Sequence, residues 1–229
     1  MNIGALQKFS LIEYPGKICA IVFTQGCNFR CPYCHNRELV DPEAYGPTIT
    51  ESDVFSFLEK RKKKLDAVTV TGGEPTLQPD IFSFLEKLKT MGYLTKVDSN
   101  GSHPEVLKKL IDSRLVDYIA LDVKAPLARY REITRSGIRE EDIRESIECV
   151  MSSGVDYEFR TTVVPCLLSP DDLTDIARTI SGARRFALQR FVPSKTLDPA
   201  FLNERNYPEE TFASIADVIR PFVSELIVR

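Results

Sequence analysis

The regular alternation of short apolar runs with helical patterns limits the fold of this chain more than any other feature. Six runs have the length and composition of buried strands: Ile18–Thr24, Ala67–Thr71, Leu94–Ser99, Tyr118–Val123, Tyr157–Val164 and Phe186–Val192. A candidate seventh is Glu225–Val228. Strand–helix units repeated in this way predict a parallel sheet with right-handed crossover connections.

Between these runs, apolar residues recur three and four positions apart, as they do on the buried face of a helix. Four stripes follow this spacing: Ile81–Leu88, Ile143–Val150, Leu173–Ile180 and Phe212–Ile219. The third also has a start signal, because Ser169 suits an N-cap and Pro170 suits the first helical position. We therefore expect helices in the connections between the strands.

Polar and glycine-rich residues gather where each apolar run ends. The ends read FTQGC, VTGGEP, VDSNG, LDVK, FRTTVVP and LQRFVP. An open doubly wound sheet and a (β/α) barrel both place their sites at the carboxyl ends of strands. Polar groups converging from six consecutive strands favour a barrel mouth. With about six units instead of eight, we predict a partial (β/α)6 TIM-type barrel of parallel strands with outer helices, as a single domain over residues 1–229.

Composition and charge exclude several other classes of protein. The chain is 43% hydrophobic with a net charge of −3, so nothing in its charge favours nucleic acid or an anionic membrane as a partner. The basic run Lys60–Lys64 is expected late on a helix that begins near Asp53, where it solvates the surface. The first residues lack the pattern of a signal peptide, and no apolar segment approaches the roughly 20 residues of a membrane span. We expect a cytoplasmic protein.

Three of the six cysteines, Cys27, Cys31 and Cys34, lie within eight positions in the stretch QGCNFRCPYCHN. A structural zinc site needs a fourth ligand, for which His35 is the only neighbour, and a thiol redox pair leaves Cys27 unexplained. Three thiolates that hold an iron–sulfur cube leave one iron open for another ligand. The remaining cysteines are scattered in apolar surroundings and are expected to be buried small side chains: Cys19, Cys149 and Cys166.

The cysteine stretch and its surroundings resemble a known family. Cys27-x3-Cys31-x2-Cys34, with Tyr33 before the last cysteine, is similar to the cluster loop of the radical S-adenosylmethionine superfamily. The segment from YPGK to IVFTQGCNFRCPYCHN resembles the corresponding sequence of the activating enzymes of glycyl radical enzymes, most closely that of the anaerobic ribonucleoside-triphosphate reductase activating proteins. The likeness runs from about residue 8 to residue 165. It implies that the three cysteines bind a 4Fe–4S cluster whose fourth iron binds S-adenosylmethionine.

The resemblance also assigns a role to the glycines after the second strand. Taken alone, Gly72 and Gly73 indicate only a tight turn or a close approach of backbone. By the match to the family's GGE motif, Gly72, Gly73 and Glu74 hold the amino group of S-adenosylmethionine. A carboxylate beside backbone carbonyls suits an ammonium group, because such hydrogen bonds are charge-assisted.

Residues at the ends of later strands complete the expected cofactor site. Asp122 and Lys124 are two apart in a strand, so both side chains point to one face, where they pair with each other or bind a ligand. The resemblance places Lys124 against the methionine carboxylate, and Asp122, Asp98 and Asn100 near the ribose or a bound cation. Taken alone, the segment that begins at Asp98 indicates a turn. Arg160 faces inward by alternation and is a candidate contact for the cofactor carboxylate or the reacting peptide.

The sequence also departs from the family pattern. Arg37 stands where cluster loops often have a proline, and Gln189 stands where some relatives have a late-strand histidine, so Gln189 is the candidate contact there. His103 precedes a helix and is expected at the surface. No further cysteine cluster lies between Cys34 and Gly72, which excludes the larger activases with a ferredoxin-like insert.

The function implied by the resemblance is radical generation. One electron from flavodoxin or ferredoxin cleaves S-adenosylmethionine, and the 5′-deoxyadenosyl radical takes a hydrogen atom from the Cα of a glycine in a partner glycyl radical enzyme. That partner is expected to be anaerobic ribonucleoside-triphosphate reductase. Two alternatives stay open: a radical enzyme acting on a small molecule, similar to deazaguanine synthases, and a zinc or thiol-redox binding module.

Overall fold

The computed structural model describes all residues 1–229 and contains one eight-stranded sheet whose strands follow one another in chain order. The strands are β1 Ile3–Ser10, β2 Cys19–Thr24, β3 Ala67–Gly72, β4 Leu94–Ser99, β5 Tyr118–Asp122, β6 Asp156–Val163, β7 Ala183–Arg190 and β8 Val223–Val228. β1 is antiparallel to β2, and every later neighbour is parallel. β1 and β8 are the two edges, so the barrel is not closed.

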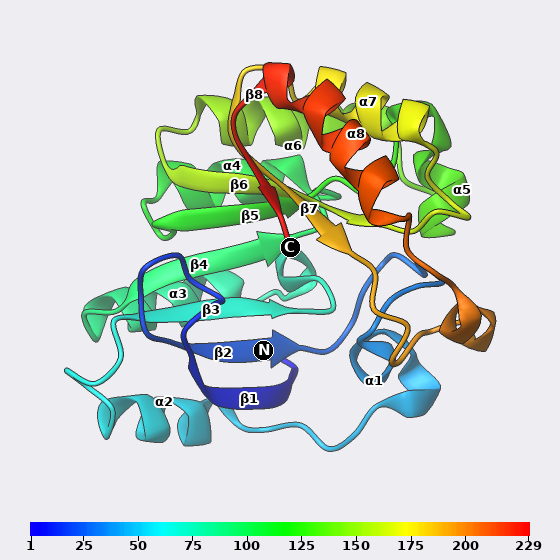
Figure 1. Cartoon of the computed structure of the whole chain (residues 1–229). Coiled ribbons are helices and arrows are strands. Elements are labelled where there is room, and N and C mark those ends of the chain that lie inside the picture. Colours follow the sequence, from blue (N-terminus) through cyan, green and yellow to red (C-terminus); the bar gives the residue numbers. More distant parts are fainter.

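Helices fill the crossovers between parallel strands (Figure 1). They are α1 Arg37–Val40, α2 Glu51–Glu59, α3 Ile81–Thr90, α4 Pro104–Asp112, α5 Tyr130–Thr134, α6 Glu140–Ser152, α7 Pro170–Thr179 and α8 Glu209–Ile219. In α3, the expected stripe is buried in full, and each large apolar side chain so buried stabilises the fold by roughly 1.5–3 kcal/mol. α7 begins with the expected cap, where Ser169 and Asp172 form a reciprocal capping box.

The predicted partial barrel is confirmed, with one parallel strand more than the six counted. The candidate seventh run is β8, which pairs with β7. The sequence prediction missed β1, whose residues are mostly half-buried or exposed because it is an edge strand. An edge strand with only one paired side carries a weak alternation of apolar and polar residues, so its pattern is hard to recognise.

The two faces of the sheet differ in chemistry. Side chains that point outward meet the helices and form an apolar core, to which Val97 of β4 belongs. Side chains that point into the barrel lumen are largely polar, and on β4 these are Lys96 and Asp98, one on each side of Val97 in the sequence. This alternation has the period of two that every strand imposes, and it places the charged groups of neighbouring strands in the same lumen.

Two local expectations were wrong. The basic run Lys60–Lys64 begins at the C-cap of α2 and continues past it as a turn, instead of forming the last turn of the helix. Cys166 is exposed and Cys149 is half-buried, whereas Cys19 is buried as expected. None of the helices has the length and apolar character needed to cross a membrane.

Candidate functional site

A cavity of about 420 Å³ lies at the carboxyl ends of the strands. All the site residues predicted from the sequence line it: Cys27, Cys31, Tyr33, Cys34, Gly72, Gly73, Glu74, Asp98, Asn100, Asp122, Lys124, Arg160 and Gln189. The parallel register brings them together, because it places the ends of β2 through β7 at the same edge of the sheet. In Figure 1 the loop after β2, which carries the cysteines, lies on the side to which the strand arrowheads point.

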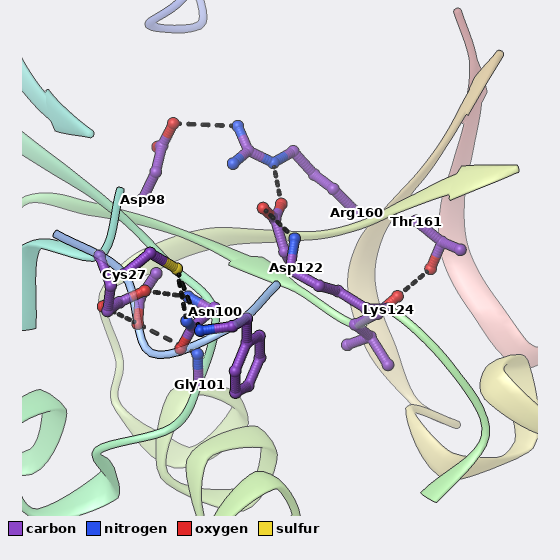
Figure 2. A network of polar contacts seen from close by, with 12 residues as sticks. Cys27, Asp98, Asn100, Gly101, Asp122, Lys124, Arg160 and Thr161 are labelled. Atoms are coloured by element: carbon purple, nitrogen blue, oxygen red, sulfur yellow. Dashed lines mark hydrogen bonds and ion pairs between the residues drawn. The ribbon is translucent and has the colours of Figure 1, made fainter. Parts of the chain in front are cut away.

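The three clustered cysteines are free thiols, and Cys31 is buried. The Sγ atom of Cys27 accepts weak hydrogen bonds from the backbone N–H of Phe29 at 3.4 Å and from Nδ2 of Asn100 at 3.8 Å (Figure 2). Burial raises the pKa of Cys27 to about 12, with Glu74 adding to the effect, and burial raises the pKa of Cys31 to about 11. Without a metal these thiols are therefore neutral at pH 7.

The cysteine loop fits an iron–sulfur cube better than a single ion. No group of three or more His, Cys, Asp or Glu side chains in the structure converges so that it could hold one metal ion. A cube binds each thiolate to a different iron, so its ligands stand further apart than those of one zinc. The thiols also make few hydrogen bonds that metal binding would break. The positive charge of Lys124 lowers the pKa of Cys31 and so partly offsets the rise caused by burial.

Gly72 and Gly73 allow the end of β3 to pack directly against the loop that leads to the cysteines. A Cβ on Gly72 would lie 2.4 Å from the backbone N of Thr24, and one on Gly73 would lie 2.1 Å from the carbonyl O of Gly26. Gly72 also has a φ of +116°, which disfavours any other residue. Backbone packing therefore requires glycine at both positions. The same close approach includes a hydrogen bond from the backbone N–H of Glu74 to Gly26 O at 2.7 Å.

Glu74 is almost fully buried and is surrounded by hydrogen-bond donors. Its Oε1 accepts from the backbone N–H and hydroxyl of Thr76 and from the hydroxyl of Ser99, while Oε2 accepts from the backbone N–H of Asn100 at 2.7 Å. Burial raises the pKa of Glu74, and the hydrogen bonds from Thr76, Asn100 and Ser99 oppose that rise. Since Oε2 carries a single protein hydrogen bond, this oxygen keeps capacity for a further donor.

Asp98, Asp122, Lys124 and Arg160 form a continuous ion network in the lumen (Figure 2). Arg160 donates from Nε to Asp122 at 2.7 Å and from Nη1 to Asp98 at 3.1 Å. Lys124 Nζ donates to the other oxygen of Asp122 at 3.2 Å. Burial alone would raise the pKa of each aspartate, but the neighbouring cations hold both values below the usual range.

Two cations of this network have donors to spare. Lys124 Nζ makes one hydrogen bond to protein and Arg160 Nη2 makes none, although both side chains line the cavity. Burial lowers the pKa of Lys124, but Asp122, together with Tyr33, Cys31 and Tyr130, outweighs this and raises the pKa well above its ordinary value. Both side chains are therefore charged and able to bind an anionic group in the cavity.

Sequence reasoning missed Glu13 and Lys96. Lys96 Nζ donates to Asp98 at 2.6 Å and to Glu13 at 3.0 Å. Lys96 could have been found by the rule that placed Asp122 with Lys124, because it precedes Asp98 by two positions on the same strand. Glu13 carried no such signal, since it lies in the loop between β1 and β2 and enters the lumen from there.

The segment after β7 packs against the cysteine loop. His35 stacks on the ring of Phe191 with an interplanar angle of 9°, and its Nε2 lies 2.7 Å from the carbonyl O of Val192. Tyr33 meets Phe191 edge-on, and the backbone N–H of Asp198 donates to Pro32 O at 2.9 Å. These contacts occupy His35 and help to fix the loop, whereas Gln189 lines the cavity without a side-chain hydrogen bond to protein.

His103 is half-buried instead of exposed, which corrects the expectation from the sequence. Its Nδ1 lies 3.1 Å from the hydroxyl oxygen of Thr76. The same Nδ1 lies 2.9 Å from the hydroxyl oxygen of Ser102. His103 therefore lies behind Glu74 and supports its hydrogen-bond partner.

Comparison with known proteins agrees with this geometry. Residues 21–181 match the Radical SAM superfamily. A Methanocaldococcus jannaschii protein with the provisional name of a glycyl-radical enzyme activating enzyme, MJ1227, is 32% identical over 99% of this chain and 95% of its own length. The pyruvate formate-lyase-activating enzyme of Clostridium pasteurianum is 31% identical over 86% of this chain and 83% of its own.

Solved structures share the fold at low sequence identity. Streptococcus suis SuiB bound to S-adenosylmethionine superposes with a TM-score of 0.65 and 15% identity over 91% of this chain, which spans only 49% of the SuiB chain. A structure of TYW1 with a lysine-pyruvate adduct gives a TM-score of 0.61 at 15% identity, over 88% of this chain and 72% of the TYW1 chain. Fold, motif and sequence similarity agree, and the chain belongs to the radical S-adenosylmethionine superfamily, in the class of glycyl-radical enzyme activating enzymes.

Proposed function

We propose that this enzyme uses a 4Fe–4S cluster and S-adenosylmethionine to take a hydrogen atom from a glycine Cα of a partner glycyl radical enzyme. The partner we propose is anaerobic ribonucleoside-triphosphate reductase, because the cysteine loop and the YPGK segment resemble those of its activating proteins. Flavodoxin or ferredoxin would deliver the electron. We further propose that residues 1–229 act as one domain.

The observation that carries this proposal is the meeting, in one cavity, of three free thiols with two cations that keep unused N–H donors. The thiols of Cys27, Cys31 and Cys34 would bind the cluster. When bound, the cluster supplies the electron that splits the sulfonium of S-adenosylmethionine into methionine and a 5′-deoxyadenosyl radical. Because thiolates are the form that binds iron, these raised pKa values mean that the loop releases protons when the metal enters.

The other residues of the cavity would orient the cofactor through its charged ends. Lys124 and Arg160 have the free N–H groups that a carboxylate needs. The free capacity of Glu74 Oε2 and the carbonyls near Gly73 suit an ammonium group. Asp122 would hold both cations in position, since it accepts from Arg160 at one oxygen and from Lys124 at the other.

The open side of the barrel supports a protein substrate. The edges β1 and β8 are not paired to each other, so the lumen is not enclosed by strands on all sides. A peptide loop needs such lateral access if its backbone is to reach a reactive centre inside the lumen. A small-molecule substrate would not require it.

The test is anaerobic incubation of the cluster-loaded enzyme with S-adenosylmethionine, a reductant and a candidate partner, followed by electron paramagnetic resonance. We expect a glycyl radical doublet in anaerobic ribonucleoside-triphosphate reductase, and none in pyruvate formate-lyase. A doublet only in pyruvate formate-lyase would correct the partner. Methionine and 5′-deoxyadenosine formed with no radical in either partner would instead favour a small-molecule substrate.

A matched pair of lysine variants tests the proposed orientation of the cofactor. Lys124→Ala should keep the cluster but weaken S-adenosylmethionine binding by roughly 10- to 100-fold, because a charge-assisted hydrogen bond is lost. Lys108→Ala is the control, since Lys108 is also paired with an aspartate but is exposed on α4. Equal affinities of the two variants would contradict the role given to Lys124.

A further inference from the structure

Lys96 is a fully buried ammonium group beneath the cofactor cavity. Its side chain has no exposed area, and its Nζ lies between Asp98 at 2.6 Å and Glu13 at 3.0 Å. The Tyr118 ring lies 6.0 Å from the same nitrogen. A buried lysine is costly unless its charge is matched, so two carboxylates against one ammonium indicate a fixed charge that the site requires.

Counting the charges of the ion network shows that it is balanced by protein groups alone. The ion network has three acids and three bases: Glu13, Lys96, Asp98, Asp122, Lys124 and Arg160. Asp98 receives Lys96 at Oδ1 and Arg160 at Oδ2, and Asp122 receives Arg160 and Lys124 in the same way. All four oxygens of the two aspartates therefore already contact a cation of the protein.

The sequence resemblance allowed these two aspartates to hold a bound cation, and the structure does not fit that reading. A metal ion at Asp98 would compete with Lys96 and Arg160 for the same oxygens. An ammonium group is a compact point charge, comparable to an alkali ion, and on Lys96 it is covalently tethered. A tethered charge also loses less entropy on binding than a free ion does.

We propose that Lys96 is a built-in counter-ion that takes the place of an inorganic cation beside Asp98, so that the cofactor site forms without an alkali-metal ion. Its ammonium fixes Asp98, which fixes Arg160, whose guanidinium reaches Asp122 and the cavity. Lys96 is thus a positioning residue, because it lines no part of the cavity itself. The inference rests on the proposed use of this cavity for S-adenosylmethionine.

The test compares potassium chloride with choline chloride at equal ionic strength, since choline is too large to enter the site. The wild-type enzyme should melt at the same temperature in both salts. Lys96→Met leaves the network one negative charge in excess, so potassium should raise its melting temperature by about 3–6 °C. Lys96→Arg keeps the charge and should behave as the wild type does.

A charge-balanced double variant separates the counter-ion role from packing. Lys96→Met combined with Glu13→Gln removes one base and one acid, so the remaining groups are neutral in sum and should show no response to potassium. The measurement is made at about pH 8.5, far above the ordinary pKa of a glutamate. This choice matters because burial, and then Asp98, raise the pKa of Glu13, while Lys96 and Arg160 lower it. At lower pH a proton on Glu13 would replace the alkali ion.

Binding of S-adenosylmethionine to the cluster-loaded proteins supplies the second readout. Potassium should tighten binding to Lys96→Met by about tenfold and leave the wild type unchanged. Potassium dependence of the wild type, no dependence in Lys96→Met, or equal dependence in the double variant would each overturn the inference. A wild type that binds no S-adenosylmethionine would instead refute the proposed function, while the melting temperatures of the cluster-free proteins would still decide the role of Lys96.

Discussion

The cysteine loop and the ion network line the same cavity but differ in how complete they are. Cys31 is buried, Cys27 and Cys34 are half-buried, and all three are free thiols with raised pKa values and few hydrogen-bond partners. In the network, by contrast, every carboxylate already contacts a cation, and the pKa values of Asp98 and Asp122 are lowered. The first region needs an added group to satisfy it, whereas the second is satisfied by the protein.

This difference indicates a division of labour within one cavity. A loop whose thiols are neutral and poorly bonded can exchange protons for iron at little cost in protein contacts. A balanced network cannot gain or lose a charge without leaving a partner buried and unpaired. The loop is therefore suited to acquire a cofactor, and the network to present fixed charges to it.

Removing one thiol should have the largest effect. Cys31→Ala should abolish cluster assembly and reduce cleavage of S-adenosylmethionine to background, because two cysteines cannot hold the cube. Iron and sulfide analysis after anaerobic reconstitution measures this. Cys166→Ala, at an exposed cysteine, should assemble the cluster normally. A Cys31→Ala protein with about four irons per chain would show that the loop does not need this thiol.

Removing one cation should chiefly affect stability. Arg160→Met leaves an oxygen of Asp98 and one of Asp122 without their partner, which should cost about 3–5 kcal/mol and lower the melting temperature by roughly 10 °C. Arg139→Met, which breaks an exposed pair with Asp142 on the surface, should leave the melting temperature almost unchanged. Similar melting temperatures for the two variants would mean that the network is not a balanced unit.

The pH dependence of unfolding should distinguish the two regions with smaller effects of opposite sign. The pKa of Asp98 is lowered in the folded state, so its contribution to stability is present above about pH 4 and is lost as the pH falls further. The pKa of Glu74 is raised, so its contribution is present below about pH 4 and is lost as the pH rises through the folded value.

Urea unfolding of the metal-free protein from about pH 3 to pH 7 measures both effects. Asp98→Asn should flatten the loss of stability in acid, because the group that must be protonated is gone. Glu74→Gln should steepen it, because a group that gains a proton favourably in the folded state is gone. Parallel profiles for the two variants would contradict the assignment of opposite pKa shifts.

Much of this could be predicted from the sequence because local rules carry it. The period of two in LDVK places Asp122 and Lys124 on one face, and the structure shows them paired at 3.2 Å. The apolar stripe from Ile81 to Leu88 predicted α3 because its spacing matches a helical turn. The same rule applied to the segment before Asp98 would also have identified Lys96.

Other features depend on partners that no local pattern names. The sequence could not show that Glu13 reaches Lys96, since these residues are 83 positions apart and the contact depends on the path of the loop after β1. The same holds for the packing of Val192 against His35, which are 157 positions apart. Nor could it show that the glycines after β3 are required by backbone packing against Thr24 and Gly26.

The sequence by itself determined the order of the parallel strands, the three-cysteine loop and the set of polar residues at the strand ends. These follow from spacing along one chain, which fixes the face on which each side chain lies. Only the tertiary structure decided which of those residues are still free to bind a cofactor and which are already bound to each other. That depends on the register between strands and on loops from distant parts of the chain. The fold decides which opposite charge lies close enough to pair with a charge buried in the lumen.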